Sequence, residues 1–404
     1  MLKKLEDLRQ QARIAAGIID RKVYSGPWTV QIDLTNRCNN DCIACWCNSP
    51  LLGDKGMPSG IRDATLPYER LVTIVDELSA LGVRSIYFTG GGEPFMHPRI
   101  LDLISYIKGK GIHLDMSTNF TLVDRATAEE LVRLELDHMN LSLWAGSREV
   151  YAKQHPNKSE ETFDRMTEVI RHINELKRRR GQTVPGLGMY NVINVHNYQD
   201  IHNMLEFAFR HRMDHVHFTH VDTVPDRTEV LALDRARLEE LAAMAREVPR
   251  LTGELGARFG HRLHLIGFET FLRRTLSSGA PEANYDTDLL AVMPSCYAGW
   301  SFARILANGE INSCLKSFKI PVGNIHEDSF TRIWFGERQA EFRDHTIDYD
   351  PGDPYFLNMG NDMATDGQGC QKCCDNLGLN LDIQGRLDKL NAVTKGALKI
   401  LRFL

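Results

Sequence analysis

Three cysteines near the start of the chain have the spacing of a metal-binding loop: Cys38, Cys42 and Cys45 form a C-x3-C-x2-C pattern. Three thiolates bind three irons of a [4Fe–4S] cluster, and the fourth iron then stays open to a small molecule. Zinc is the alternative, although zinc sites usually combine C-x2-C pairs. Because three ligands suffice for such a cluster, we interpret the nearby Cys47 as a free cysteine, with substrate contact or hydrogen-atom donation as the alternative.

A second group of cysteines lies in the C-terminal part of the chain, and no cysteine lies between the two groups. Cys296 and Cys314 belong to a C-x12-G-x4-C pattern, and Cys370 and Cys373 form a C-x2-C pair with Cys374 adjacent. Four thiolates in two pairs suit either a fully ligated iron–sulfur cluster or structural zinc. The two groups therefore predict two separate metal centres.

The composition is that of a globular protein with a substantial core: 404 residues, of which 43% are hydrophobic and 25% charged. The net charge of −5 gives no attraction to nucleic acid. The sequence has neither a signal peptide nor an apolar run of membrane-spanning length. We therefore expect a cytoplasmic protein with no nucleic-acid or membrane partner, in a compartment where clustered cysteines bind metals rather than form disulfides.

Strand and helix patterns alternate along the first part of the chain. Strands are predicted at residues 28–35, 84–90, 112–119, 138–144, 186–194 and 214–221, and helices at 67–83, 98–111, 125–135, 159–180, 198–211 and 233–248. Such units predict a parallel sheet, and their number is too small for an eight-fold barrel. We expect an α/β fold: a partial (β/α)6 TIM-like barrel whose active site lies at the carboxyl ends of the strands.

The expected domains follow the change of pattern along the chain. Residues 1–25 form an N-terminal helix, 26–250 the barrel core, 251–290 a linker region, 291–380 a domain for the second cysteine group, and 381–404 a C-terminal helix. Asn308 and Gly309 predict the turn of a β-hairpin within the fourth segment.

The first cysteine loop and the segment "TGGGEP" (Thr89 to Pro94) together resemble the radical S-adenosylmethionine (SAM) superfamily. The resemblance implies that Cys38, Cys42 and Cys45 hold a [4Fe–4S] cluster whose open iron binds SAM, and that the cofactor is cleaved to a 5′-deoxyadenosyl radical. It further implies cofactor contacts from Gly91, Gly92, Glu93, Ser117, Asn119, Ser142, Lys158, Asn194 and Trp46.

The second cysteine group is similar to the SPASM or shortened "twitch" extensions of this superfamily. Because no cysteine follows Cys374, the resemblance implies a twitch domain with one auxiliary [4Fe–4S] cluster. Its ligands would be Cys296, Cys314, Cys370 and Cys373, with Cys374 as the alternative to Cys373.

The function implied is a radical SAM oxidoreductase that abstracts hydrogen from a polar small molecule, sugar- or cyclitol-like, and passes an electron to the auxiliary cluster. The short segment before the first strand favours this substrate over a peptide, because peptide maturases often carry an N-terminal recognition module. The alternatives are a ribosomal-peptide maturase or epimerase, and a non-catalytic zinc or iron–sulfur scaffold. An electron donor such as flavodoxin or ferredoxin is the expected partner.

Three histidines around the sixth predicted strand, His215, His217 and His220, raise the question of a further metal site. Because His217 and His220 lie on opposite faces of an ideal strand, we expect packing or substrate contact instead. Thr219, His220 and Asp222 are the candidate substrate contacts.

Overall fold

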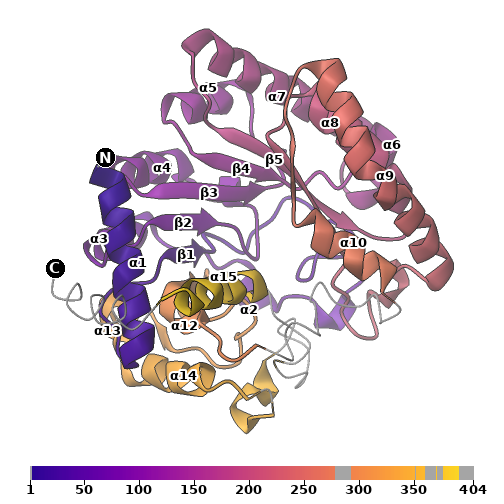
Figure 1. The fold of residues 1–404 in the computed structure, drawn as a ribbon. Coiled ribbons are helices and arrows are strands. Elements are labelled where there is room, and N and C mark those ends of the chain that lie inside the picture. The colour runs from indigo at the N-terminus through magenta and orange to yellow at the C-terminus, as the bar shows by residue number, and fades with distance from the viewer. Residues whose placement is uncertain (1, 278–292, 351, 360–369, 371–375, 391–404) are drawn as a thin grey trace.

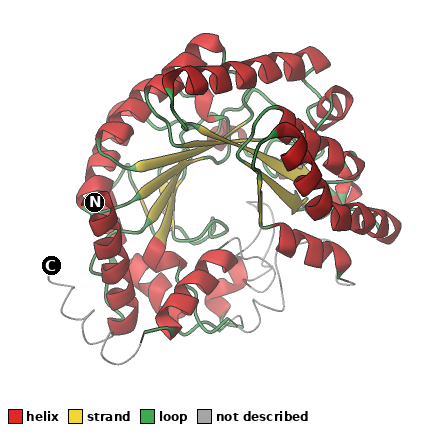
Figure 2. Ribbon diagram, turned by 45° about the horizontal axis from the view of Figure 1, so that its top comes forward, coloured by secondary structure: helices red, strands yellow, loops and turns green. Residues whose placement is uncertain are grey.

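A computed structural model of the protein describes residues 2–277, 293–350, 352–359, 370 and 376–390 (Figure 1). Its centre is one sheet with the strand order β10-β9-β8-β1-β2-β3-β4-β5-β6-β7. Figure 2 shows the strands curving around an interior, with helices on the outer side. This is the partial barrel that the sequence predicts.

The six predicted strands are all present and pair in parallel with their neighbours in chain order. They are β1 Thr29–Ile32, β2 Ser85–Phe88, β3 His113–Thr118, β4 His138–Leu141, β5 Gly186–Ile193 and β6 His215–His220. A seventh parallel strand that the sequence analysis did not predict, β7 His264–Ile266, pairs with β6.

The helices that cover the barrel begin and end where local sequence signals place them. Asp124 caps the helix that follows it by accepting a hydrogen bond from Thr127 N, and Gly181 ends another helix with a φ of 64°. The α-helices of the first part are α1 Leu2–Asp20, α2 Ser59–Arg62, α3 Tyr68–Ala80, α4 Ile100–Gly109, α5 Arg125–Arg133, α6 Arg148–Gln154, α7 Glu160–Arg180, α8 Ile201–Arg210, α9 Arg235–Phe259 and α10 Phe268–Leu276.

Each barrel strand has one apolar and one polar face, because successive side chains point to opposite sides. In β2, Ile86 and Phe88 are fully buried in the core beneath the helices, whereas Tyr87 faces the interior cavity. In β5, Met189 and Ile193 belong to the core and Tyr190 lines the cavity. The barrel interior is therefore polar, which suits a binding site rather than a second core.

The C-terminal part continues the barrel sheet instead of forming a detached unit. The strand β8 Phe302–Ile305 pairs in parallel with β1, and β9 Glu310–Asn312 returns antiparallel to β8 and pairs with β10 Gly323–Asn324. Gly309, with a φ of 89°, forms the predicted hairpin turn. The helices here are α12 Ala298–Ser301, α13 Phe330–Trp334, α14 Glu337–Ile347 and α15 Leu377–Asp388.

Two of the expected domain boundaries differ from the positions at which the observed elements begin and end. The boundary at residue 250 falls inside α9, and residues 251–277 of the expected linker contain the end of α9, β7 and α10. The strand β7 pairs in parallel with β6 and so extends the barrel sheet, and α10 follows it directly. The C-terminal helix begins at Leu377 rather than at 381, and residues 391–404 lie outside the described part.

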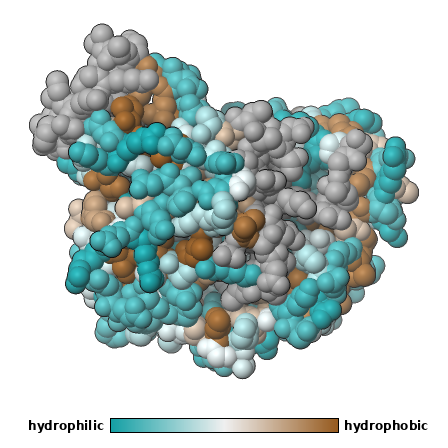
Figure 3. All heavy atoms as spheres, turned by 90° about the horizontal axis from the view of Figure 1, so that it is seen from below, coloured by the Kyte–Doolittle hydropathy of each residue, from teal (hydrophilic) through white to brown (hydrophobic). Residues whose placement is uncertain are grey.

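No helix among the described residues is long and apolar enough to span a membrane. On the face of the molecule shown in Figure 3, hydrophilic side chains are widespread and hydrophobic side chains form separate small groups.

Candidate functional site

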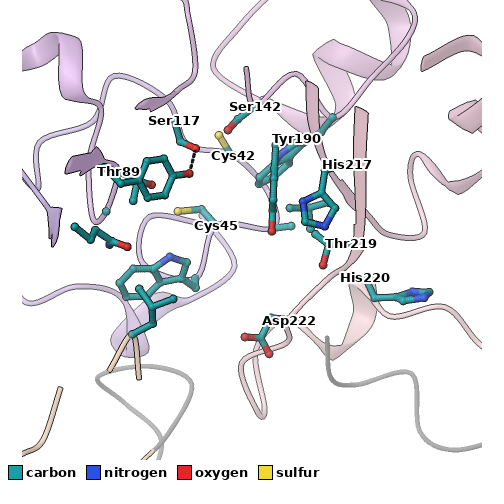
Figure 4. Close-up of a pocket in the computed structure, with 18 of the residues that line it drawn as sticks. Cys42, Cys45, Thr89, Ser117, Ser142, Tyr190, His217, Thr219, His220 and Asp222 are labelled. Carbon is teal, nitrogen blue, oxygen red and sulfur yellow. Dashed lines mark hydrogen bonds between the residues drawn. The ribbon is translucent and has the colours of Figure 1, made fainter. Parts of the chain in front are cut away.

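A cavity of about 740 Å³ lies where the carboxyl ends of the barrel strands meet the C-terminal part. Cys42 and Cys45 lie on one side of it, and Tyr190, His217 and Thr219 face them from β5 and β6 (Figure 4). Its lining also includes Gln31, Cys38, Trp46, Tyr87, Glu93, Ser117, Asn119, Ser142, His220, Asp222, Phe271, Arg273, Arg274, Arg304, Lys316, Phe318 and Leu381. The cysteine loop, the Gly91–Glu93 turn and the carboxyl ends of β3 to β6 therefore meet at one cavity.

The three cysteines of the first group lie on the loop after β1 and all line this cavity. Burial raises the pKa of the Cys38 thiol to about 12 and also raises that of Cys42. Hydrogen bonding from Cys47 lowers the pKa of Cys45 to about 7. A cysteine binds a metal only as the deprotonated thiolate. Binding of a cluster must therefore release protons from this loop.

The glycines of "TGGGEP" hold the cysteine loop in place by close packing. A Cβ at Gly92 would lie 2.2 Å from Arg37 O and 2.6 Å from Thr35 O, and a Cβ at Gly91 would lie 2.3 Å from Asn36 Oδ1. A side chain at Gly92 would push the loop backbone away from the strand end, whereas a side chain at Gly91 would displace the side chains of Asn36 and Met57. The structure thus gives these glycines a packing role beside the cofactor role that the sequence predicts.

Glu93 lies at the cavity wall and connects this turn to the end of β3. Its carboxylate accepts hydrogen bonds from Thr118 Oγ1 at 2.6 Å, Asn119 N at 2.7 Å and Phe95 N at 3.1 Å. Because the side chain is buried, its pKa is raised to about 7 despite these donors. Three donors from the protein make Glu93 an organising group for the strand ends.

Several of the predicted cofactor contacts line the cavity: Trp46, Gly91, Gly92, Glu93, Ser117, Asn119 and Ser142. The Ser117 hydroxyl lies 2.5 Å from the hydroxyl of Tyr87 (Figure 4). The Trp46 ring contacts Phe318 with a centroid distance of 5.6 Å, and the Arg304 guanidinium lies 5.9 Å from the Trp46 ring centroid. Trp46 therefore forms a boundary between the cysteine loop and the C-terminal part.

The other two predicted contacts, Lys158 and Asn194, lie outside the lining of the cavity. Lys158 Nζ donates to Asn39 O at 2.6 Å, on the outside of the cysteine loop. Asn194 is fully buried and exchanges two hydrogen bonds with the side chain of Gln154. The sequence did not reveal that the side chain of Lys158 is hydrogen-bonded to Asn39, or that of Asn194 to Gln154.

A clamp on the cysteine loop, formed by residues 154–158 after α6, was not predicted. Ile43 N donates to Gln154 O at 2.9 Å, and Asn157 N donates to Asp41 Oδ1 at 2.9 Å. The buried ring of His155 places Nδ1 at 3.1 Å from Cys42 Sγ. Polar residues in an irregular turn have no periodicity, and of this segment the sequence analysis named only Lys158, from the family resemblance.

Cys47 is buried and outside the cavity lining. Its Sγ donates to Gly91 O at 3.2 Å and lies 3.5 Å from Cys45 Sγ. This position favours the interpretation as a free cysteine over substrate contact.

Among the described residues, no three His, Cys, Asp or Glu side chains are arranged to hold a single metal ion, and this includes the histidines of β6. His217 packs edge-on against Tyr190 in the cavity wall, and His220 lies opposite, stacked on Phe271 and within 3.0 Å of Thr275 Oγ1. Asp222 pairs with Lys316 at 2.9 Å across the boundary to the C-terminal part.

The second thiol group is brought together as predicted, as far as the structure describes it. Cys296, Cys314 and Cys370 line one small buried cavity together with Met293, Phe342, Phe356 and Asn376. Burial raises the pKa of Cys296 and of Cys370 to about 12. Cys373 and Cys374 lie outside the described residues.

Both sites have the donor chemistry of iron–sulfur centres. The first offers three thiols beside a cavity large enough for a further ligand, and amide and imidazole nitrogens approach the sulfurs. The second offers three buried thiols with amide donors and an apolar surrounding. In a cubane the thiolates bind different irons, so they need not converge on one point as around a single ion.

Comparisons with known proteins agree with this chemistry. The model of the radical SAM superfamily matches residues 32–208, and the model of the SPASM iron–sulfur cluster-binding domain matches residues 296–373. The chain is 22% identical to the tungsten-containing aldehyde ferredoxin oxidoreductase cofactor-modifying protein of Pyrococcus furiosus, over 79% of this chain and 83% of the relative. It is 26% identical to the PqqA peptide cyclase of Streptomyces rochei, over 77% and 76%.

Solved structures show the same fold. Streptococcus suis SuiB bound to S-adenosylmethionine matches with a TM-score of 0.58 at 18% identity, over 83% of this chain and 71% of that one. The enzyme anSMEcpe with bound AdoMet matches with a TM-score of 0.56 at 13% identity, over 93% and 99%. By the two family matches, the chain belongs to the radical SAM superfamily over residues 32–208 and carries a SPASM iron–sulfur domain over residues 296–373.

Proposed function

We propose that this radical SAM enzyme abstracts a hydrogen atom from a side chain of a peptide substrate held in the 740 Å³ cavity, in an oxidation that uses one auxiliary [4Fe–4S] cluster as electron acceptor. Bound at Cys38, Cys42 and Cys45, the first cluster would supply an electron that cleaves SAM to methionine and a deoxyadenosyl radical. An electron donor of the flavodoxin or ferredoxin kind would restore that electron.

The observation that carries the proposal is that one cavity reaches from the three cysteines to the opposite wall. Trp46, Ser117 and Ser142 lie on the side of the cysteine loop and are suited to bind SAM, whereas Tyr190 and His217 offer polar groups beyond them. A substrate bound against that wall would face the cofactor across the open cavity, with no protein group between them. The C-terminal part contributes Lys316, Phe318 and Leu381 to the wall of the same cavity.

The comparisons support a peptide substrate more than the small molecule that the sequence analysis favoured. The relatives with the broadest coverage include a peptide cyclase, and SuiB has been solved with a precursor peptide and anSMEcpe with peptides. A sugar-like substrate remains the second candidate because the wall of Tyr190, His217, Thr219 and Asp222 offers hydroxyl, imidazole and carboxylate groups that match hydroxyl-rich molecules.

Deuterium transfer would test the proposal. The anaerobically reconstituted enzyme is incubated with SAM, dithionite and peptides that each carry one perdeuterated amino acid, and deuterium in 5′-deoxyadenosine is measured. Transfer from a peptide supports the proposal, and transfer only from a deuterated polyol supports the second candidate. Tightly bound zinc, in place of about eight irons per chain for two cubanes, would instead show a non-catalytic scaffold.

A further inference from the structure

Two asparagines of α15 lie directly over the second thiol group. Asn380 is fully buried, and Asn376, the residue at the helix N-terminus, is nearly so. Their spacing of four residues places both on the same face of the helix. Asn376 Nδ2 lies 3.4 Å from Cys314 Sγ, and Asn380 Nδ2 lies 3.4 Å from Cys296 Sγ.

The orientation of the Asn380 amide is fixed by the backbone. Its Oδ1 accepts a hydrogen bond from Tyr297 N at 2.7 Å, and only the oxygen of an amide accepts. The nitrogen must therefore face Cys296. A thiolate bound to iron is an acceptor without a proton, so the N–H group matches the sulfur in its metal-bound state.

We infer that Asn376 and Asn380 are positioning residues that set the reduction potential of the auxiliary cluster. The inference rests on the proposal that Cys296 and Cys314 bind this cluster. An N–H group directed at a cluster sulfur stabilises the reduced, more negative state, and hydrogen bonds to the sulfurs are a main determinant of such potentials. Both donors thus make the cluster a better electron acceptor.

The rest of α15 attaches the helix to the protein without touching a described sulfur. Tyr297 OH donates to Gln384 Oε1, one helical turn beyond Asn380. Loss of this bond weakens the docking of the helix but leaves both amide donors in place. Gln384→Leu is therefore a matched control that separates the electronic effect from a packing effect.

The test is a redox titration followed by electron paramagnetic resonance. It uses the full chain with Cys38→Ala, Cys42→Ala and Cys45→Ala, so that only the auxiliary cluster contributes a signal. In this background, Asn376→Leu and Asn380→Leu are expected to shift the midpoint potential to more negative values, and both together shift it further. Gln384→Leu leaves the potential unchanged.

The outcomes separate the inference about the two asparagines from the assignment of the auxiliary cluster. An unchanged potential in the Asn380→Leu protein with full iron content overturns the inference but leaves the cluster assignment standing. A background protein that binds no iron overturns the assignment and the inference together. Should the leucine variants lose iron, Asn380→Gln is measured instead, because it keeps an amide but displaces it from Cys296. A shift of the midpoint potential to a more negative value then supports the inference, and an unchanged potential overturns it.

Discussion

Gly92 shows how a single residue positions the metal-binding loop. The backbone oxygens of Thr35 and Arg37 fill the space that a side chain at Gly92 would need, just before Cys38. The loop can avoid such a clash only by moving its backbone. The position of Cys38, the first of the proposed cluster ligands, therefore depends on glycine, which has no Cβ, at position 92.

Gly92→Ala is expected to lower the iron content of the first site and to destabilise the protein by about 1–3 kcal/mol, the usual cost of overpacking. Iron analysis and urea unfolding of the Gly92→Ala protein would measure both effects. Gly60→Ala is the matched control, because a Cβ at Gly60 meets nothing within 4 Å. Full iron content in the Gly92→Ala protein would show that the loop shifts freely.

Lys158 is the residue for which sequence and structure differ most clearly. Its ammonium group binds Asn39 O instead of lining the cavity. Lys158→Met is therefore expected to leave the dissociation constant of SAM unchanged within about twofold, while it loosens the loop and lowers iron retention. Equilibrium dialysis with the reconstituted protein would measure SAM binding. A loss of about tenfold in affinity, or 1.4 kcal/mol, would restore the cofactor role that the sequence predicted.

At the scale of elements, β2 and β3 show a clear alternation and were predicted, whereas β7 was missed. β2 and β3 alternate between core and cavity residues, so their faces follow from the sequence. β7 has three residues that are all at least partly exposed, so no alternation marks it. The clamp at residues 154–158 was missed for a related reason: its contacts to the cysteine loop join segments more than a hundred residues apart.

The pairing of β1 with β8 depends on a buried ion pair. Arg304 Nη2 lies 2.6 Å from Asp33 Oδ2, and both side chains are 5% exposed or less. Arg304→Met leaves the Asp33 carboxylate buried without its partner, which is expected to cost about 3–5 kcal/mol of unfolding free energy. Urea unfolding would measure this loss.

Glu239→Gln provides the control for the ion pair, because the salt bridge between Arg235 and Glu239 is exposed and is expected to contribute less than about 0.5 kcal/mol. Equal losses in the Glu239→Gln and Arg304→Met proteins would contradict a special role of the buried pair. The double variant Asp33→Asn with Arg304→Met should regain part of the stability, because no unpaired charge remains.

The amino-terminal ends of β3 and β4 are joined by a contact whose strength depends on pH. His113 Nε2 lies 3.0 Å from Asp115 Oδ1, and Nδ1 lies 3.3 Å from Asp137 Oδ1. Hydrogen bonds to Asp115 and then Asp137 raise the pKa of His113 from 6.5 to about 9. A raised pKa means that the stabilisation is complete below pH 6.5 and is lost as the pH rises through 9.

The expected result is that the stability difference between the wild-type protein and His113→Gln falls steadily between pH 6.5 and 9. Urea midpoints measured for both proteins at several pH values test this, and the subtraction cancels other groups that titrate in both. A difference that stays constant, or grows with pH, would contradict the contact.

At the scale of the whole molecule, the sheet is continuous from β10 to β7, so both cysteine groups are attached to the same sheet. Trp46, next to Cys45, contacts Phe318, and Arg304 donates to the carbonyl of Leu315, next to Cys314. Spacing of cysteines predicted both sites from the sequence. Their connection through side chains could not be predicted, because it depends on how the C-terminal hairpin docks on β1.

This arrangement predicts separable functions for the two sites. The double variant Cys296→Ala with Cys314→Ala removes ligands of the second site, but its changed residues lie outside the lining of the main cavity. It should keep about half of the iron, which corresponds to one cubane, and should still cleave SAM to deoxyadenosine. It should not release oxidised product, because the electron acceptor is absent.

Chromatographic measurement of deoxyadenosine and product, together with iron analysis, would check this separation. Glu239→Gln is the control, since Glu239 is exposed and lines neither cavity, and it should leave both reactions in place. Loss of SAM cleavage in the double variant would mean that the C-terminal part supports the geometry of the first site through Arg304 and Phe318. Product formation at the wild-type rate would mean that the electron leaves by another route, and the auxiliary cluster would then have a structural role.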